Sequence, residues 1–151
     1  MATVALSGND VISINNRVFS DLADGNCFEL NFPNKIAAVK LGKNGNAIYS
    51  INKTGLLAES VLRLIRGSSD DKFMQGLLAT QQANFAAWVL MIGTFTKQIG
   101  HGDGTISADT YVLSGGVFVE QVPGKQNVEG DTEQSVSIYK IDWSNAPRAI
   151  T

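Results

Sequence analysis

The fold is decided by residues 68–98, SSDDKFMQGLLATQQANFAAWVLMIGTFTKQ, which hold the one convincing helix of the chain and its longest run of strand-forming residues. A hydroxyl at residues 68–69 can accept a hydrogen bond from the free amides of a first helical turn, while Asp70 and Asp71 would lie at the positive end of the helix dipole. A helix is therefore predicted to begin here. Its apolar stripe recurs at helical spacing and needs a surface to pack against; it comprises Phe73, Met74, Leu77, Leu78 and Gln81.

The run at residues 85–98 predicts a strand covered on both faces, because aromatic and β-branched residues suit a pleated surface and both of its alternating sets begin apolar. A buried helix is the alternative, against which Gly93, Thr94 and Thr96 count. For residues 56–66 a strand is preferred, with an amphipathic helix left open. Further strands are expected at residues 11–14, 17–19, 27–32, 36–41, 47–52, 111–122 and 135–143. Within residues 111–122, Gly115 and Gly116 predict a bulge or sharp bend.

These expectations amount to about eight strands and one helix without a strand-helix alternation, which argues against a parallel α/β sheet. The predicted fold is mainly β: two packed antiparallel sheets forming a sandwich or partly closed barrel, with one flanking helix. The length of 151 residues predicts a single domain, residues 1–151. Within it we expect a flexible N-terminal arm at residues 1–10, a projecting hairpin at 42–54 and a C-terminal tail at 144–151, where Pro147 would block further sheet.

The composition argues against several classes of protein. A net charge of −2 and an isoelectric point near 5.3 provide no basic footprint, which argues against a protein that grips DNA through clustered lysine and arginine. The single cysteine, Cys27, has no partner for an internal disulfide and is expected to be a buried hydrophobic residue. Neither a membrane span nor a signal peptide is expected.

Residues that could support catalysis are few. The one histidine, His101, is expected to be a solvated surface residue in a glycine-rich loop. With Asp103 and Ser107 it has the residue types of a catalytic triad, but that loop offers no rigid scaffold. A second imidazole or a cysteine pair for zinc is missing, and the acids at 129, 131 and 133 lack the spacing of a calcium motif. We therefore expect no enzyme, no metal and no cofactor.

The hairpin at residues 42–54 is unusual because it has little local core. Tyr49 and Ile51 alternate with Ser50 and Asn52 between polar turns. Two interpretations stay open at this point: an ordinary edge hairpin, or an arm that completes its burial on another subunit.

The final third of the chain reads YVLSGGVFVEQVPGKQNVEGDTEQSVSIYKIDWSNAPRAI, and upstream the motifs ADGN, GKNGNAIYSIN and GSSDD follow one another. In order and spacing these segments resemble tail tube proteins of contractile-tailed bacteriophages, and the resemblance covers most of the chain. It implies a two-sheet β fold with one helix, similar to the tube subunit of type VI secretion systems.

The resemblance also implies an assembly. Hexameric rings would form, strands of each copy would join a continuous barrel around a channel, and the rings would stack inside a sheath. In such a tube the hairpin would reach a neighbouring ring through Lys43, Asn44, Asn46, Ile48, Tyr49 and Ile51. The residues implied for the barrel strands are Trp88, Leu90, Ile92, Val112 and Phe118.

The implied function is structural: the inner tail tube of a virion, assembled in the cytoplasm of the host bacterium, through which the genome is ejected. The implied partners are further copies of the chain, the tail sheath protein, the baseplate and tail terminator proteins, and, inside the lumen, the tape measure protein and double-stranded DNA bound without sequence specificity. No membrane anchor is implied. Mild acidity suits such a channel, because a Lys/Arg array would hold the DNA.

Two alternatives remain open from the sequence. One is a delivery tube of the type VI kind, with the same architecture and a different cargo. The other is a small ligand-binding β-sandwich, which would keep Trp88, Tyr111, Tyr139 and Trp143 near a groove.

Overall fold

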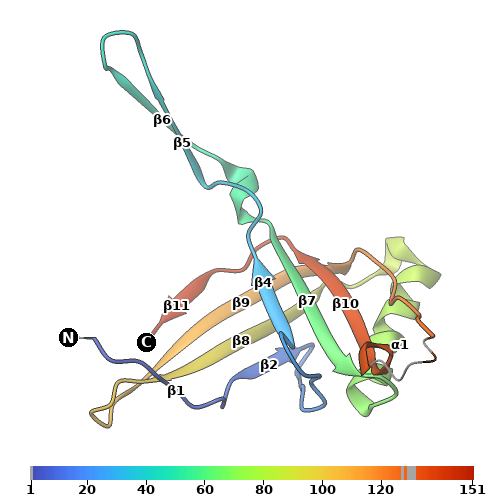
Figure 1. The fold of residues 1–151 in the computed structure, drawn as a ribbon. Coiled ribbons are helices and arrows are strands. Elements are labelled where there is room, and N and C mark those ends of the chain that lie inside the picture. Colours follow the sequence, from blue (N-terminus) through green and yellow to red (C-terminus); the bar gives the residue numbers. More distant parts are fainter. Residues whose placement is uncertain (1, 127, 129–131) are drawn as a thin grey trace.

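The chain folds into a large bent sheet, one helix and a long two-stranded arm that stands away from both (Figure 1). The computed structural model describes residues 2–126, 128 and 132–151. The prediction of a mainly β fold with one helix and two antiparallel sheets is confirmed. The two sheets are unequal in size, and within the described residues the large one is not closed into a barrel.

The large sheet has nine strands in the order β3-β2-β8-β9-β10-β7-β4, with β1 added to β8 and β11 added to β9. Their bounds are β1 (Ala5–Leu6), β2 (Val11–Ile14), β3 (Arg17–Val18), β4 (Phe28–Asn31), β7 (Ala58–Ile65), β8 (Met91–Gly100), β9 (Ile106–Phe118), β10 (Val136–Trp143) and β11 (Arg148–Ile150). The small sheet consists of β5 (Ala37–Leu41) and β6 (Ala47–Ile51), and short 3-10 turns occur at Lys53–Leu56, Phe85–Ala87 and Thr132–Ser135. The strand at β7 confirms the preferred interpretation of residues 56–66.

The large sheet bends at a bulge in β9. Met91 of β8 lies opposite Gly116, but Gly93 lies opposite Leu113, so one residue of β8 faces two of β9. Gly115 has a φ of 68°, a conformation that favours glycine. Up to Leu113 β9 pairs with β8. Beyond the bulge Gly116 still pairs with Met91, while Val117 and Phe118 pair with β10. The predicted irregularity at this glycine pair is confirmed, and it lets one strand take part in both halves of the sheet.

The bulge also brings the backbone of Gly116 against the core. A Cβ atom at this position would lie 2.5 Å from Cζ3 of Trp143 and 3.0 Å from Cβ of Met91. Trp143 is fully buried and donates from Nε1 to Oγ of Ser60 at 2.9 Å, so its ring has no free direction in which to move. We expect Gly116→Ala to lower the free energy of unfolding by about 1–3 kcal/mol through overpacking.

Urea denaturation of the purified variant tests this expectation. Gly76→Ala is the matched control, because Gly76 lies in the helix and nothing is within 4 Å of an added Cβ atom. The control should be neutral or stabilising by up to about 1 kcal/mol, owing to the higher helix propensity of alanine. Equal effects at the two sites would show that the close approach at Gly116 is unimportant.

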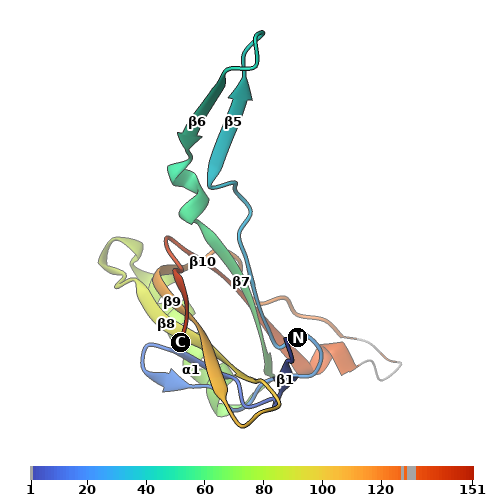
Figure 2. The same cartoon turned by 90° about the vertical axis from the view of Figure 1, so that its left-hand side faces the viewer.

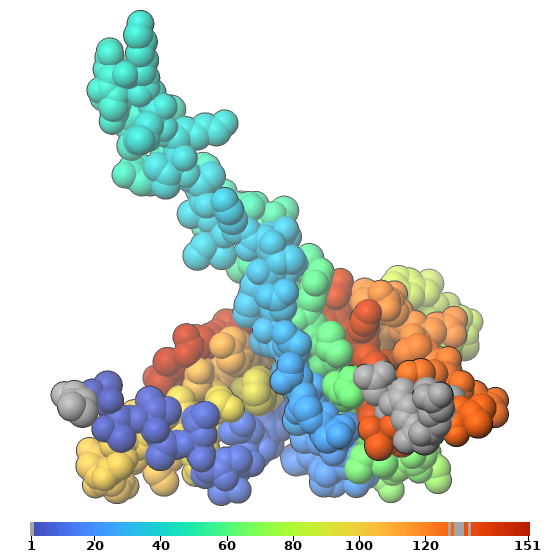
Figure 3. All heavy atoms as spheres, viewed as in Figure 1, coloured from blue at the N-terminus to red at the C-terminus, as the bar shows by residue number. Residues whose placement is uncertain are grey.

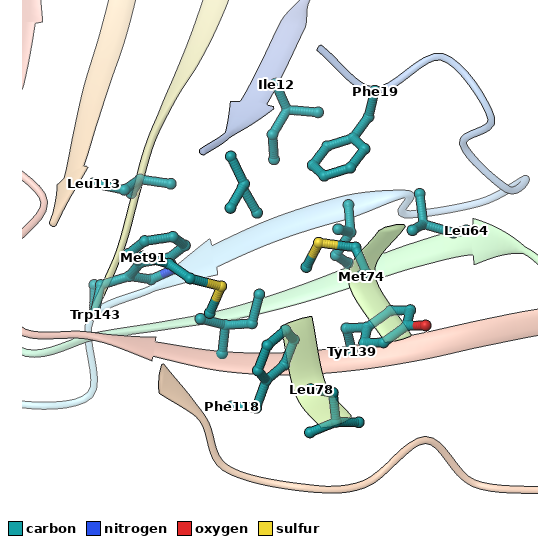
Figure 4. Packing of buried hydrophobic residues seen from close by; sticks show 14 of the residues in the cluster. Ile12, Phe19, Leu64, Met74, Leu78, Met91, Leu113, Phe118, Tyr139 and Trp143 are labelled. Carbon is teal, nitrogen blue, oxygen red and sulfur yellow. The ribbon is translucent and has the colours of Figure 1, made fainter. Parts of the chain in front are cut away.

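The core lies between the two halves of the bent sheet. Ile12 of β2 and Leu113 of β9 come from one half, while Tyr139 and Trp143 of β10 come from the other, and all belong to one buried cluster (Figure 4). Phe28 of β4 meets Phe95 of β8 edge to face, with ring centroids 4.8 Å apart. The halves therefore pack as a sandwich although they are one continuous sheet.

The helix α1 (Ser69–Ala83) packs against this core and begins as predicted. The hydroxyl of Ser68 accepts from the amide of Asp71 at 3.2 Å, and both acids lie in the first turn. Met74 and Leu78 are buried. Buried Gln81 exchanges two hydrogen bonds of 2.8 Å with the backbone of Phe118, which attaches the helix to the end of β9.

The prediction of a strand across the whole of residues 85–98, covered on both faces, is wrong for the first six of these residues, 85–90. Residues Phe85–Ala87 form a 3-10 turn, and β8 begins only at Met91. The helix ends at Ala83, and the extended backbone of Asn84 turns the chain away. Among the described residues, no strand pairs with the apolar residues that follow. The side chain of Val89 is 81% exposed, and on β8 itself Ile92 is also exposed.

The C-terminal tail also differs from expectation, because β11 follows Pro147 and pairs with residues Asp109–Tyr111 of β9. The proline precedes the strand, so its missing amide is not needed there, and its carbonyl oxygen accepts from the amide of Val112 at 3.0 Å. The guanidinium of Arg148 forms a bidentate ion pair with the carboxylate of Asp109, with hydrogen bonds of 2.7 and 2.8 Å. At the other end of the chain, β1 lies within residues 1–10 and pairs with β8.

Candidate interface surfaces

The most conspicuous surface is the arm, which we define as residues 36–52. Its strands β5 and β6 pair over five positions, from Ala37 opposite Ile51 to Leu41 opposite Ala47. The tip is closed by a hydrogen bond of 2.7 Å from the amide of Gly42 to the carbonyl of Asn46, and Gly45 takes a φ of 84°. At the base, the amide of Asn52 donates to the carbonyl of Ile36 at 2.8 Å. Figures 2 and 3 show the arm extending far beyond the body.

One face of the arm is apolar along its whole length. Directly paired residues share a face of a sheet, and successive residues alternate between faces. The register therefore collects on one side the residues Ala37, Val39, Leu41, Ala47, Tyr49 and Ile51, which we call the apolar face of the arm. Every one of them is exposed, Tyr49 at 76% and Ile51 at 78%. An exposed apolar surface of this kind is typical of a protein–protein contact.

The residues implied for contact with a neighbouring ring all lie in the arm, either in its tip or on its two strands. Lys43, Asn44 and Asn46 lie in the turn at the tip, while Ile48 lies on the face opposite to that of Tyr49 and Ile51. Val39 and Leu41 complete the apolar face and were not among the implied residues. Val39 and Leu41 belong to this face because of the register in which β5 and β6 pair. The Asn-Gly turn in the sequence does not by itself determine that register. That these residues contact another copy remains a prediction.

A second surface lies on the outer side of β4, β7 and β10. Exposed Glu29 and Glu59 alternate with residues that point into the core, and Asp142 stands between buried Ile141 and Trp143. Asp142 is paired directly with Glu59 in the sheet register. We call Glu29, Glu59 and Asp142 the acidic patch.

The acidic patch is electrostatically unfavourable in the isolated chain. Burial raises the pKa of Asp142, and the carboxylate of Glu59 raises it further. Like charges directly opposite each other destabilise a sheet. Lys140, which lies nearby on β10, is already paired with Glu120 at 3.1 Å. A cation from outside the chain would relieve this repulsion.

The residues implied for a barrel occupy different environments. Trp88 and Leu90 precede β8, so they are not strand residues; half-buried Trp88 donates from Nε1 to the carbonyl of Gly116 at 3.3 Å and covers one end of the core. Ile92 and Val112 lie on strands with exposed side chains, whereas Phe118 is buried in the core. Participation of these strands in an intersubunit barrel remains a prediction.

Comparison with known proteins bears on these surfaces. No protein-family model matches the sequence, and no curated protein does. Among solved structures, a chain from the PVC sheath–tube complex of an extracellular contractile injection system, in its extended state, is similar with a TM-score of 0.56. The fold is similar to that of a contractile injection system chain. The likeness covers 94% of this chain and 87% of the other at 8% sequence identity, so it concerns the fold and not individual residues.

The neighbour belongs to a sheath–tube complex rather than to an enzyme. In this chain, Nε2 of His101 lies 2.8 Å from Oγ of Ser107, and Nδ1 lies 3.3 Å from the carbonyl of Thr3, so the histidine is half-buried and bonded instead of solvated as predicted. Asp103 accepts hydrogen bonds from the amide and hydroxyl of Thr105. The three residues therefore do not form a triad arrangement.

Other candidate sites give no further chemistry. Cys27 lies just before β4 instead of within a strand, half-buried and with a free thiol. Over the part of the chain that the structure describes, no three His, Cys, Asp or Glu side chains are grouped for a metal ion. The calcium hypothesis rested partly on Glu129 and Asp131, which lie outside the described residues. Searched over the same residues, no helix is long and apolar enough to cross a membrane.

Proposed function

We propose that this chain is the repeating subunit of a tube in a contractile tail, built from hexameric rings that stack along an axis. The observation that carries the proposal is the arm with its exposed apolar face. A stable monomer would gain nothing from holding Val39, Tyr49 and Ile51 in water, whereas burial against another copy would stabilise the contact by about 25 cal/mol per Å² of apolar surface. Similarity to a chain of a sheath–tube complex supports the same role.

Within this proposal the tube is the inner tail tube of a virion, surrounded by sheath protein and joined to baseplate and tail terminator proteins. Its lumen would hold the tape measure protein and then pass the genome into the host. The net charge of −2 suits passage of a polyanion, since phosphates are not neutralised and held by the wall. A delivery tube of the type VI kind fits the same fold with another cargo.

The ligand-binding alternative loses its main support. Tyr139 and Trp143 are fully buried in the core, so they do not line a groove. Tyr111 stacks on Phe95 and Trp88 packs near Phe118, at different places in the core. The four aromatic residues therefore do not form a common binding surface.

The oligomeric state of the purified chain tests the proposed function. We expect rings or short tubes in negative-stain electron micrographs, and a mass well above 16.1 kDa in light scattering coupled to size-exclusion chromatography. A compact monomer that persists at high protein concentration would overturn the proposal. If rings or tubes form, genome ejection and effector delivery can be told apart by imaging particles from cells that express the neighbouring genes.

A further inference from the structure

The arm concentrates positive charge in an acidic protein. Between Glu29 and Glu59 the sequence contains no acid and four lysines. Lys40 and Lys43 lie in the arm and Lys35 and Lys53 flank its base, so the arm with its base carries +4. The whole chain carries −2, which leaves −6 on the remainder. The chain is therefore divided into a basic projection and an acidic body.

The four lysines make no ion pair within the part of the chain that the structure describes. All are exposed. The body behaves differently, since Arg17, Lys97, Lys140 and Arg148 each pair with a carboxylate at 2.7–3.1 Å. The exposed lysines of the arm and its base therefore remain available for an external partner, as does Lys72 on α1.

The body presents a surface of opposite charge. The acidic patch lies on the outer side of β4, β7 and β10, and its carboxylates have no cation partner among the ion pairs of the described residues. Exposed Val119 and half-buried Val61 line a groove there together with Glu59, Asp142 and the ion pair of Lys140 with Glu120, so the charged side chains of the groove sum to −2. This surface combines acids with apolar side chains, as the arm combines lysines with apolar side chains.

We propose that the arm of one copy binds the outer side of β4, β7 and β10 of a second copy. Lys43 of the tip would lie closest to Glu59 and Asp142, the apolar face of the arm would pack against Val61 and Val119, and Lys40 would add positive charge from the other side of the ribbon. The proposal rests on the proposed function, because it assigns the chemistry of the contact between copies. Charge complementarity of this kind fixes register and speeds association. The arm points away from the body of its own chain, so the contact is between molecules (Figure 1).

Two other occupants are less favourable. Two arms placed side by side would bring together +2 and +2 from Lys40 and Lys43, and a lysine such as Lys40 on a strand opposes edge-to-edge pairing. A nucleic acid would neutralise the lysines, but its phosphates would leave Val39, Tyr49 and Ile51 without apolar contacts. An acidic and partly apolar protein surface satisfies both features of the arm.

A charge-swap experiment tests the proposal on the full chain. The arm variant carries Lys40→Glu and Lys43→Glu, the face variant carries Glu59→Lys and Asp142→Lys, and the combined variant carries all four substitutions. We expect the arm variant and the face variant each to weaken association between rings by at least about tenfold, because each brings like charges together at the contact. The combined variant should recover the association, and added salt should weaken it in the wild type and in the combined variant.

Sedimentation and tube length in negative stain measure the association, and circular dichroism verifies that each variant is folded. Lys72→Glu is the matched control, since Lys72 is exposed on α1 and reversing its charge should leave association unchanged. Single rings that persist in all variants while the combined variant stays unstacked would overturn this inference and leave the proposed function standing. A wild type that forms no rings would refute both.

A DNA duplex of random sequence serves as the competing probe. If the arm binds a second copy, the wild type should bind this duplex weakly, and the arm variant should bind it about as weakly. If the arm variant loses DNA binding while its association with other copies is unchanged, the arm is a nucleic-acid contact and the inference is wrong.

Discussion

Replacing residues Ala37–Ile51 by a Gly-Ser-Gly linker is expected to give a folded subunit that forms single rings and no stacked tubes. The buried core contains no residue of this segment, so its removal does not expose the core. The base stays intact, because the amide of Asn52 already donates to the carbonyl of Ile36 and the two ends of the deletion lie side by side. What is lost is the apolar face of the arm together with Lys40 and Lys43.

Electron microscopy and analytical ultracentrifugation distinguish rings from tubes in this experiment. A milder variant, Tyr49→Ser with Ile51→Ser, should shorten the tubes, while Val128→Ser should not, although Val128 is 98% exposed. Tubes of normal length from the shortened chain would refute an axial role for the arm. Loss of the rings themselves would place the arm in lateral contacts instead.

Asp70→Asn is expected to cause the largest loss of stability among polar substitutions, about 3 kcal/mol at neutral pH. The carboxylate is 1% exposed and accepts hydrogen bonds of 2.8 Å from Nε of Arg17 and from the amides of Ser20 and Asp21. It therefore holds the segment after β3 against the first turn of α1. An asparagine keeps the volume but turns an NH₂ group toward donors and removes the ion pair.

The effect should depend on pH in a defined direction. Burial alone would raise the pKa of Asp70, but the hydrogen bonds from Asp21 and Ser20 and the guanidinium of Arg17 outweigh it, so the pKa lies below its ordinary value of 3.8. The ionised carboxylate is thus more stable in the folded state, and its contribution is complete above pH 3.8 and lost as the pH falls through the lower folded value.

Urea denaturation at a series of pH values measures this dependence. The difference between the wild type and Asp70→Asn should be constant at neutral pH and shrink in acid below about pH 4. Asp24→Asn, in an exposed loop, is the control and should change little. A difference that does not depend on pH would show that the charge of Asp70 is not what stabilises the fold.

Local sequence signals predicted the elements whose cause is local. The serine and acids at residues 68–71 specify a helix start, Asn15 and Asn16 adopt positive φ in a turn, and the Gly115–Gly116 pair bends a strand. In each case the side chain or the missing Cβ atom acts on its own backbone. Such signals can be read without knowing what lies opposite.

Features that depend on distant partners were missed. The apolar run that begins at Phe85 looks like a strand, but a strand needs a neighbour to pair with, and the chain supplies one only from Met91. Pro147 suggested an end of the sheet, yet β9 had room for one more strand beyond it. The buried pair of Arg17 and Asp70 joins residues far apart in the sequence, so their spacing carried no signal.

The separation of core and arm has an evolutionary consequence. Substitutions between Ala37 and Ile51 can alter how copies recognise each other while leaving the folding of each copy untouched, because the buried core draws on none of those side chains. Related lineages could therefore diverge in partner choice by drift in a short exposed ribbon, and an engineer could build mutually exclusive families of filaments on one unchanged scaffold.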